Sequence, residues 1–285
     1  MLARCSTRVF GSYASLILPS HLVHRVSQRA MSARATSSPA VASLFTDQDI
    51  AQLVTDTASL RRPFGSALVS AVFAAANQPQ EAGRTLSHTL TLITESETGS
   101  AEASVLRVQQ QEAIQLTREA LLKAAPLCGF PRIINAMNSC VAAVDPRLLA
   151  DLPIRAPRAV QTVGDMTAWY ERGRDFFTTV YAHHTGRVLS MLKRAYPDMA
   201  EVIIQDMYGK ILSDPRFFGA METELLAVGV LGTLEVPAQL RGHVGGARNA
   251  GATPEQIEAV QTITRRIYDR TRTAAAAAAA SLSSQ

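Results

Sequence analysis

The stretch between Glu224 and Gln256 restricts the fold of this chain more than any other part of the sequence. An apolar run follows Glu224, and Pro237 can begin a second helix because proline is tolerated in the first helical turn. Gly251 provides a left-handed C-cap, and Thr253 and Gln256 form a capping box at the start of a third helix. The pattern therefore predicts a hairpin of two short helices followed by a third helix.

Helical periodicity extends through most of the remaining chain. Apolar residues form stripes with helical spacing at residues 199–211, 224–231 and 257–267, which are too regular for strands. Hydrophobic residues make up 47% of the sequence but aromatic residues only 6%. We therefore predict an all-α protein of packed helical hairpins, with about ten helices.

Composition divides the chain into four expected regions. Residues 1–35 form a presequence, which we expect to be disordered, and residues 47–145 form an N-terminal helical region. A core region covers 166–273, and a low-complexity tail rich in alanine covers 274–285. The proline-rich residues 146–165 are the candidate linker between the two helical regions.

The positive net charge of +4 belongs to the start of the chain. Residues 1–46 contain five arginines and no lysine, aspartate or glutamate, so the rest carries 23 basic against 24 acidic residues. This distribution does not indicate a nucleic-acid-binding protein. An Arg-rich and Ser-rich segment without acidic residues is typical of an organelle transit peptide. We therefore expect import into the mitochondrial matrix, with a disordered tail or a secretory signal as alternatives.

Several kinds of site find no support in the sequence. No apolar run approaches the roughly 18 residues that a membrane-spanning helix needs, so we expect no integral membrane segment. Cys128 and Cys140 have no ligand-type residue at metal-site spacing and are expected to be buried free thiols. His183 and His184 are adjacent, so on a helix their side chains point about 100° apart and cannot readily chelate one ion. We expect neither a metal nor a cofactor.

Glu224 and His243 are the candidate catalytic residues. They lie on the two helices of the predicted hairpin, so antiparallel packing can bring their side chains together. A carboxylate that holds an imidazole in one tautomer makes the imidazole a competent general acid or base. The alternative is a buried contact that stabilises the helix pair and has no catalytic role.

The spacing of Glu224 and His243 resembles the carboxymuconolactone decarboxylase and alkylhydroperoxidase D superfamily. In the peroxidase branch of that superfamily a Cys-x-x-Cys pair lies between the glutamate and the histidine. Here Val236 and Gln239 occupy the two cysteine positions. The resemblance implies the helical scaffold of the superfamily without dithiol peroxidase chemistry.

A second segment resembles the Gly-Phe-Pro helix hairpin of the decarboxylase branch. It includes Gly129 and Pro131, which are expected to shape a pocket. Glu119 and Asn138 are nineteen positions apart, the same separation as Glu224 and His243. An internal duplication is therefore plausible, in which the first copy has asparagine in place of histidine. Asparagine can hydrogen-bond a substrate oxygen but cannot transfer a proton, so Asn138 is expected to position substrate.

Two functions are compatible with this pattern. The first is a cofactor-free acid–base lyase or decarboxylase acting on a small lactone or oxoacid, in which His243 transfers the proton and Glu224 orients His243. Its expected substrate-binding residues are Gly129, Pro131, Asn138 and Gln239. The second is a non-catalytic oligomeric scaffold or ligand-binding protein of the same superfamily. In both cases the resemblance implies a homo-oligomer, either a trimer or a hexamer.

Overall fold

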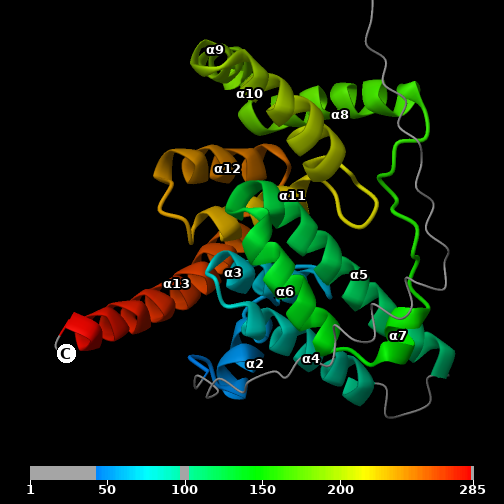
Figure 1. Cartoon of the computed structure of the whole chain (residues 1–285), viewed down its shortest axis with the longest axis vertical. Helices are drawn as coiled ribbons and strands as arrows, with labels where there is room; N and C mark the ends of the chain where they lie inside the picture. The colour runs from blue at the N-terminus through cyan, green and yellow to red at the C-terminus, as the bar shows by residue number, and fades with distance from the viewer. Residues whose placement is uncertain (1–42, 97–102, 284–285) are drawn as a thin grey trace, which may run out of the picture. The chain divides into compact units, whose positions relative to one another are not determined.

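The computed structural model describes residues 43–96 and 103–283. Residues Leu44–Gln285 form one compact unit and Met1–Ser43 are assigned to another. Across the described ranges all regular secondary structure is helical, which confirms the predicted all-α fold (Figure 1). The expected presequence at residues 1–35 lies outside the described residues.

The elements follow one another in chain order with short connections. They are α2 (Asp47–Thr55), α3 (Phe64–Ala75), α4 (Pro79–Ser96), α5 (Ala103–Cys128), α6 (Phe130–Ala142), α7 (Pro146–Ala150), α8 (Val163–Tyr181), the 3₁₀-helix η1 (Ala182–His184), α9 (Thr185–Ala195), α10 (Pro197–Val202), the π-helix η2 (Ile203–Leu212), α11 (Ala220–Leu231), α12 (Pro237–Asn249) and α13 (Pro254–Ser283).

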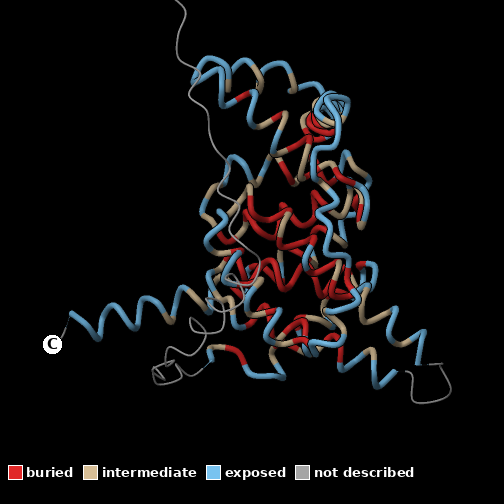
Figure 2. Tube along the Cα trace, turned by 45° about the vertical axis from the view of Figure 1, so that its right-hand side comes forward, coloured by how far each residue is buried: buried red, intermediate tan, exposed pale blue. Residues whose placement is uncertain are grey.

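Helix α3 lies at the centre of the main hydrophobic core. All of its residues are buried, because its sequence contains no charged side chain and many small ones. Helices α4, α5, α6, α11 and α13 pack against it. The buried segments of the trace in Figure 2 are concentrated where these helices meet.

The predicted N-terminal region and the predicted core region share this hydrophobic core. Phe73 and Leu121 come from the N-terminal region, and Leu226 and Ile263 come from the core region. All four side chains are fully buried in one contiguous cluster. The hairpin of α11 and α12 is therefore supported by helices that precede it by more than a hundred residues.

A second, smaller cluster joins α8 to η2. It contains Phe176, Phe177, Val180, Ile204, Tyr208 and Leu212. The backbones approach closely, because a Cβ atom at Gly173 would lie 2.3 Å from the carbonyl oxygen of Ile204. The apolar stripe at 199–211 was predicted as one helix, but the structure divides it between α10 and η2. In η2 the backbone hydrogen bonds join residues five positions apart instead of four, as in a π-helix. The Ser213 amide, for example, donates to the Tyr208 carbonyl at 2.9 Å.

The connection before α8 and the last helix, α13, agree with the sequence pattern. Residues 151–162 connect α7 to α8 without a helix, in the middle of the predicted linker. Helix α13 continues through the alanine run to Ser283, in agreement with the high helix propensity of alanine. A search of the described helices for one long and apolar enough to cross a bilayer finds none.

Candidate functional site

Glu224 and His243 are in direct contact in the structure. The glutamate lies on α11 and the histidine on α12, and the distance from Nδ1 to Oε2 is 2.9 Å. Glu224 is completely buried and His243 is only 5% exposed. The predicted antiparallel hairpin therefore brings the candidate pair together in the interior of the protein.

Gly246 makes this contact possible by allowing α12 to approach α11. It lies three residues after His243, on the same face of the helix. A Cβ atom at Gly246 would lie 2.3 Å from Oε2 of Glu224 and 2.8 Å from a methyl group of Val180. Any larger residue would push the carboxylate away from the imidazole.

The pair has a defined proton arrangement when Glu224 is ionised. A carboxylate can only accept hydrogen bonds, so Nδ1 of His243 must be the donor and Nε2 is left as an acceptor. The second carboxylate oxygen, Oε1, is buried and has no hydrogen-bond partner among the described residues. A buried carboxylate oxygen without a protein partner is costly, so this atom is available to accept a hydrogen bond from a water molecule or a ligand.

Two tyrosines lie beside the pair. The ring centroids of Tyr181 and His243 are 6.3 Å apart, and the hydroxyl groups of Tyr208 and Tyr181 are 3.5 Å apart. Burial raises the pKa of Tyr181, and burial together with the negative charges of Tyr181 and Glu224 raises the pKa of Tyr208 well above 10. Both hydroxyls therefore remain protonated near neutral pH and can act as hydrogen-bond donors.

The backbone is strained immediately after Tyr181. Ala182 has φ 45°, a value that residues with a side chain rarely adopt. The end of α8 is also attached to α12, because the Asn249 side chain donates to the Val180 carbonyl at 3.1 Å. Sequence analysis missed Tyr181, because its proximity to His243 depends on how α8 packs on α12.

The four predicted substrate-binding residues are exposed, and three of them lie away from α11 and α12. Gly129 is exposed with φ +92° at the break between α5 and α6, and Pro131 and Asn138 are exposed on α6. Helix α6 packs on α3, α4 and α5, whereas α12 packs on α8, α11 and α13. Gln239 is also exposed, but it lies one helical turn before His243 on α12. Gly129, Pro131 and Asn138 therefore lie away from the hairpin that carries the pair, whereas Gln239 is next to His243 along α12.

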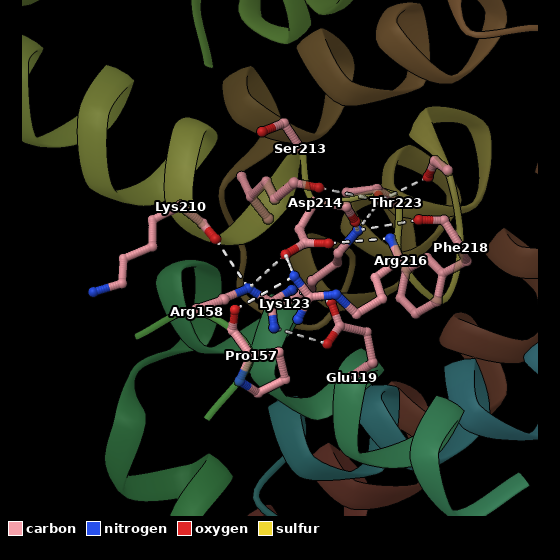
Figure 3. Close-up of polar contacts among 12 residues, drawn as sticks. Glu119, Lys123, Pro157, Arg158, Lys210, Ser213, Asp214, Arg216, Phe218 and Thr223 are labelled. Carbon is pink, nitrogen blue, oxygen red and sulfur yellow. Dashed lines mark hydrogen bonds and ion pairs between the residues drawn. The ribbon is translucent and has the colours of Figure 1, made fainter. Parts of the chain in front are cut away.

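The glutamate of the suggested duplication belongs to a different interior network, shown in Figure 3. Arg158 holds both carboxylate oxygens of Glu119, with Nη1 at 3.1 Å from Oε2. The Nε atom of Arg158 donates to the Lys210 carbonyl at 2.9 Å and lies 3.3 Å from the Asp214 carboxylate. Asn138 is exposed, so the first hairpin does not repeat the glutamate–histidine contact of the second.

Lys123 is a completely buried cation in the same region of Figure 3. Its ammonium group donates to the carbonyl oxygens of Asp214 at 2.8 Å and Phe218 at 3.3 Å, and to the Thr223 hydroxyl at 2.8 Å. Burial lowers the pKa of Lys123 to about 8. All of its hydrogen bonds go to the segment leading into α11, so Lys123 connects α5 to the helix that carries Glu224.

The cysteines do not form a reactive pair. Burial raises the pKa of Cys128 to about 11 and that of Cys140 to about 12. Both are free thiols on α5 and α6, outside the hairpin. Over the part of the chain that the structure describes, no cluster of three or more His, Cys, Asp or Glu side chains could hold a metal ion.

Cavities lie at several places around the described residues. Their volumes range from about 350 to about 690 Å³, within the range of small-molecule sites. Side chains other than Glu224 and His243 line each of them. The buried pair is thus separate from these cavities in the conformation described.

Part of the chain that includes this site is similar to known proteins. Residues 204–281 match the family model described as Carboxymuconolactone decarboxylase family. Two relatives are both named Peroxisomal protein 2. The one from Schizosaccharomyces pombe is 34% identical over 146 residues, which is 51% of this chain and 65% of the relative. The one from Saccharomyces cerevisiae is 28% identical over 170 residues, covering 53% of this chain and 60% of the relative. No solved structure matches the chain significantly.

These relatives correct one prediction from the sequence. The expected location in the mitochondrial matrix is wrong, because both relatives are named as peroxisomal proteins. An Arg-rich and acid-free segment is not by itself specific to one organelle, and composition alone could not distinguish them. The matched sequence contains both Glu224 and His243. Residues 204–281, which hold the candidate pair, are thus similar to the carboxymuconolactone decarboxylase family.

Proposed function

We propose that Glu224 and His243 form a cofactor-free acid–base pair acting on a small lactone or oxoacid. The observation that supports this most strongly is the buried contact of 2.9 Å between Nδ1 and Oε2. The carboxylate fixes the tautomer and stabilises the imidazolium that forms when Nε2 takes up a proton. This is the arrangement expected of a general base that must also return the proton.

The proposed reaction uses His243 and its neighbour Tyr181. Nε2 of His243 removes a proton from a carbon next to a carbonyl group, and the electron pair moves onto the carbonyl oxygen. The Tyr181 hydroxyl, which stays protonated because burial raises its pKa, donates a hydrogen bond to that oxygen. The imidazolium then returns the proton to carbon. In a decarboxylation Nε2 of His243 first takes the proton of the substrate's carboxylic acid group. The carbon–carbon bond to the resulting carboxylate breaks, its electron pair moves onto the neighbouring carbonyl as an enolate, and carbon dioxide leaves. The imidazolium formed in the first step then protonates the enolate carbon.

A non-catalytic role is the second candidate, and the low exposure of the pair favours it. His243 is 5% exposed, and the cavities described above are lined by other residues. In this alternative the pair stabilises the hairpin, and the protein acts as an oligomeric scaffold or as a ligand-binding protein. The catalytic proposal instead requires α8 and η2 to move so that a substrate reaches Nε2.

A turnover screen distinguishes the two candidates. Small lactones and oxoacids are incubated with the full chain and with the His243→Asn variant, which keeps a polar side chain but cannot transfer a proton at neutral pH. Loss of turnover in a variant with an unchanged thermal transition supports catalysis. Equal rates in the two proteins would leave only the scaffold role. A dithiol peroxidase activity is not proposed, because Val236 and Gln239 hold the cysteine positions.

We also propose that the chain forms a homo-oligomer and resides in peroxisomes. The resemblance to the superfamily supports the first proposal, and the names of the two relatives support the second. Light scattering of the full chain at micromolar concentration should give the mass of a trimer or hexamer, and a monomeric mass would contradict it. Fluorescent fusions at either end of the chain should colocalise with a peroxisomal marker, and a diffuse signal from both fusions would contradict that location.

A further inference from the structure

A cavity between α4, α5, α6 and residues 144–154 has the composition of a binding site for an aliphatic group. Its volume is about 510 Å³, within the range of sites for small organic molecules. Nine of its eleven lining residues are aliphatic, methionine or proline: Leu86, Ile114, Met137, Val141, Val144, Leu149, Leu152, Pro153 and Ile154. The other two are Arg118 and Cys140.

Arg118 places one positive charge at this apolar cavity. Its side chain is exposed on α5, and within the described ranges no residue forms a hydrogen bond or ion pair with it. Arg107 and Arg158, which also lie near this part of the molecule, are both paired with carboxylates. An unpaired guanidinium group can bind a carboxylate through two parallel hydrogen bonds.

The wall of the cavity that lies outside the helices is held in place on both sides. Arg107 pairs with Asp151 at the start of the connecting segment, and Arg158 pairs with Glu119 at its end. Between these ion pairs Leu152 is buried, whereas Ile154 is fully exposed at the rim. The cavity is therefore largely formed in advance, which lowers the ordering cost of binding a ligand.

We propose that this cavity binds an amphipathic monocarboxylate, with its aliphatic tail against the apolar wall and its carboxylate on Arg118. The single unpaired charge matches a monoanion, and the absence of another cationic side chain among the lining residues disfavours a dianionic phosphate ester. The proposed site is formed by α4, α5, α6 and the connection after α7. It is separate from the glutamate–histidine pair on α11 and α12 and does not depend on the acid–base proposal.

Calorimetric titration of the full chain with octanoate and decanoate tests the proposal. Each buried methylene group strengthens binding about fourfold, so decanoate should bind about 15-fold more tightly than octanoate. The Arg118→Ala variant should bind decanoate at least about tenfold more weakly, because a charge-assisted hydrogen-bonded pair is lost. Binding of decanol should not change in that variant. Arg194→Ala, on the exposed surface of α9, is the matched control and should bind decanoate normally.

The ligand is located by following the reaction of cysteines with a small methanethiosulfonate reagent. Cys140 lines the cavity and Cys128 does not. Because Cys140 is buried and burial raises its pKa to about 12, its modification is slow, and the reaction without ligand is first followed until Cys140 is measurably modified. Decanoate should then slow modification of Cys140 and leave Cys128 unaffected, as measured by mass spectrometry. Decyl phosphate, which has a tail at least as long, should protect Cys140 less well than decanoate at the same concentration.

Three outcomes would overturn the proposal. They are equal affinity for decanoate in wild type and Arg118→Ala, equal affinity for decanol and decanoate in the wild type, and unchanged modification of Cys140 at saturating decanoate. A second copy of the chain is the other conceivable occupant. If a second copy fills the cavity, decanoate should produce no heat with the wild type, and Val141→Trp, at a half-exposed rim position, should dissociate the oligomer. That result would also overturn the proposal.

Discussion

The energetic cost of burying Lys123 can be measured through its dependence on pH. Burial lowers the pKa of this lysine from the ordinary value of 10.5 to about 8. Between these two values the unfolded chain binds more protons than the folded protein, so the contribution of Lys123 to the free energy of unfolding increases with pH. Linkage over the interval from pH 7 to pH 9.5 gives a gain of about 2 kcal/mol.

The Lys123→Met variant isolates this contribution. The substitution removes hydrogen bonds to two buried carbonyl oxygens and one hydroxyl group, at about 1–3 kcal/mol for each acceptor left unsatisfied. It also removes a buried charge, which offsets part of that loss at pH 7. The informative quantity is therefore the stability difference between wild type and variant, which should increase by about 2 kcal/mol in favour of the wild type at pH 9.5.

Urea unfolding of the full chain, followed by far-UV circular dichroism at the two pH values, provides the measurement. The raised pKa values of Tyr181 and Tyr208 make their own contributions fall as pH rises, but these are common to both proteins and cancel in the difference. A difference that stays constant or shrinks between pH 7 and pH 9.5 would refute the assignment of a buried cation to Lys123.

Three further substitutions probe how the elements are held together. Gly246→Ala should lower the free energy of unfolding by about 1–3 kcal/mol, because the added methyl group would lie 2.3 Å from the Glu224 carboxylate. The matched control is Gly245→Ala, whose methyl group would have nothing within 4 Å and should be neutral or stabilising in the same thermal melt. Arg158→Met should lower the free energy of unfolding by about 3–5 kcal/mol, because it leaves the buried Glu119 carboxylate uncompensated. In a double-mutant cycle, adding Glu119→Leu should recover most of that loss, and purely additive effects would argue against the ion pair. Gly173→Ala should also destabilise the protein, since the added methyl group would lie 2.3 Å from a backbone oxygen of η2, and an unchanged melting temperature would contradict that close packing.

The hairpin that carries the candidate pair could be predicted because its signals are local. Pro237 begins α12 and Gly251, with φ +97°, ends the turn before α13, as the sequence indicated. The Thr253–Gln256 box forms, with the Thr253 amide donating to Gln256 Oε1 at 3.0 Å. Local capping and periodicity determine these elements before any tertiary contact forms, so the positions of both candidate residues followed from the sequence.

The environment of the pair could not be predicted, because it depends on contacts between distant segments. Tyr181 reaches His243 only because α8 packs on α12, and Arg158 reaches Glu119 from a connection that the sequence marked as a linker. The π-helical geometry of η2 also follows from close packing on α8. Lys123 is one of several charged residues on α5, and the sequence of the helix gives no sign that this ammonium group will be buried and bound by carbonyl oxygens of residues 214 and 218.

The account depends most on proton transfer by His243, and hydrogen–deuterium exchange at carbon tests that step directly. A panel of small oxoacids is incubated with the full chain in deuterium oxide, and loss of the signal from protons next to the carbonyl group is followed by proton NMR. If His243 transfers the proton, at least one oxoacid should show enzyme-dependent exchange, with no exchange above background in His243→Asn and slower exchange in Glu224→Gln. Exchange at the same rate in wild type and His243→Asn, or no exchange above background with any oxoacid, would contradict it.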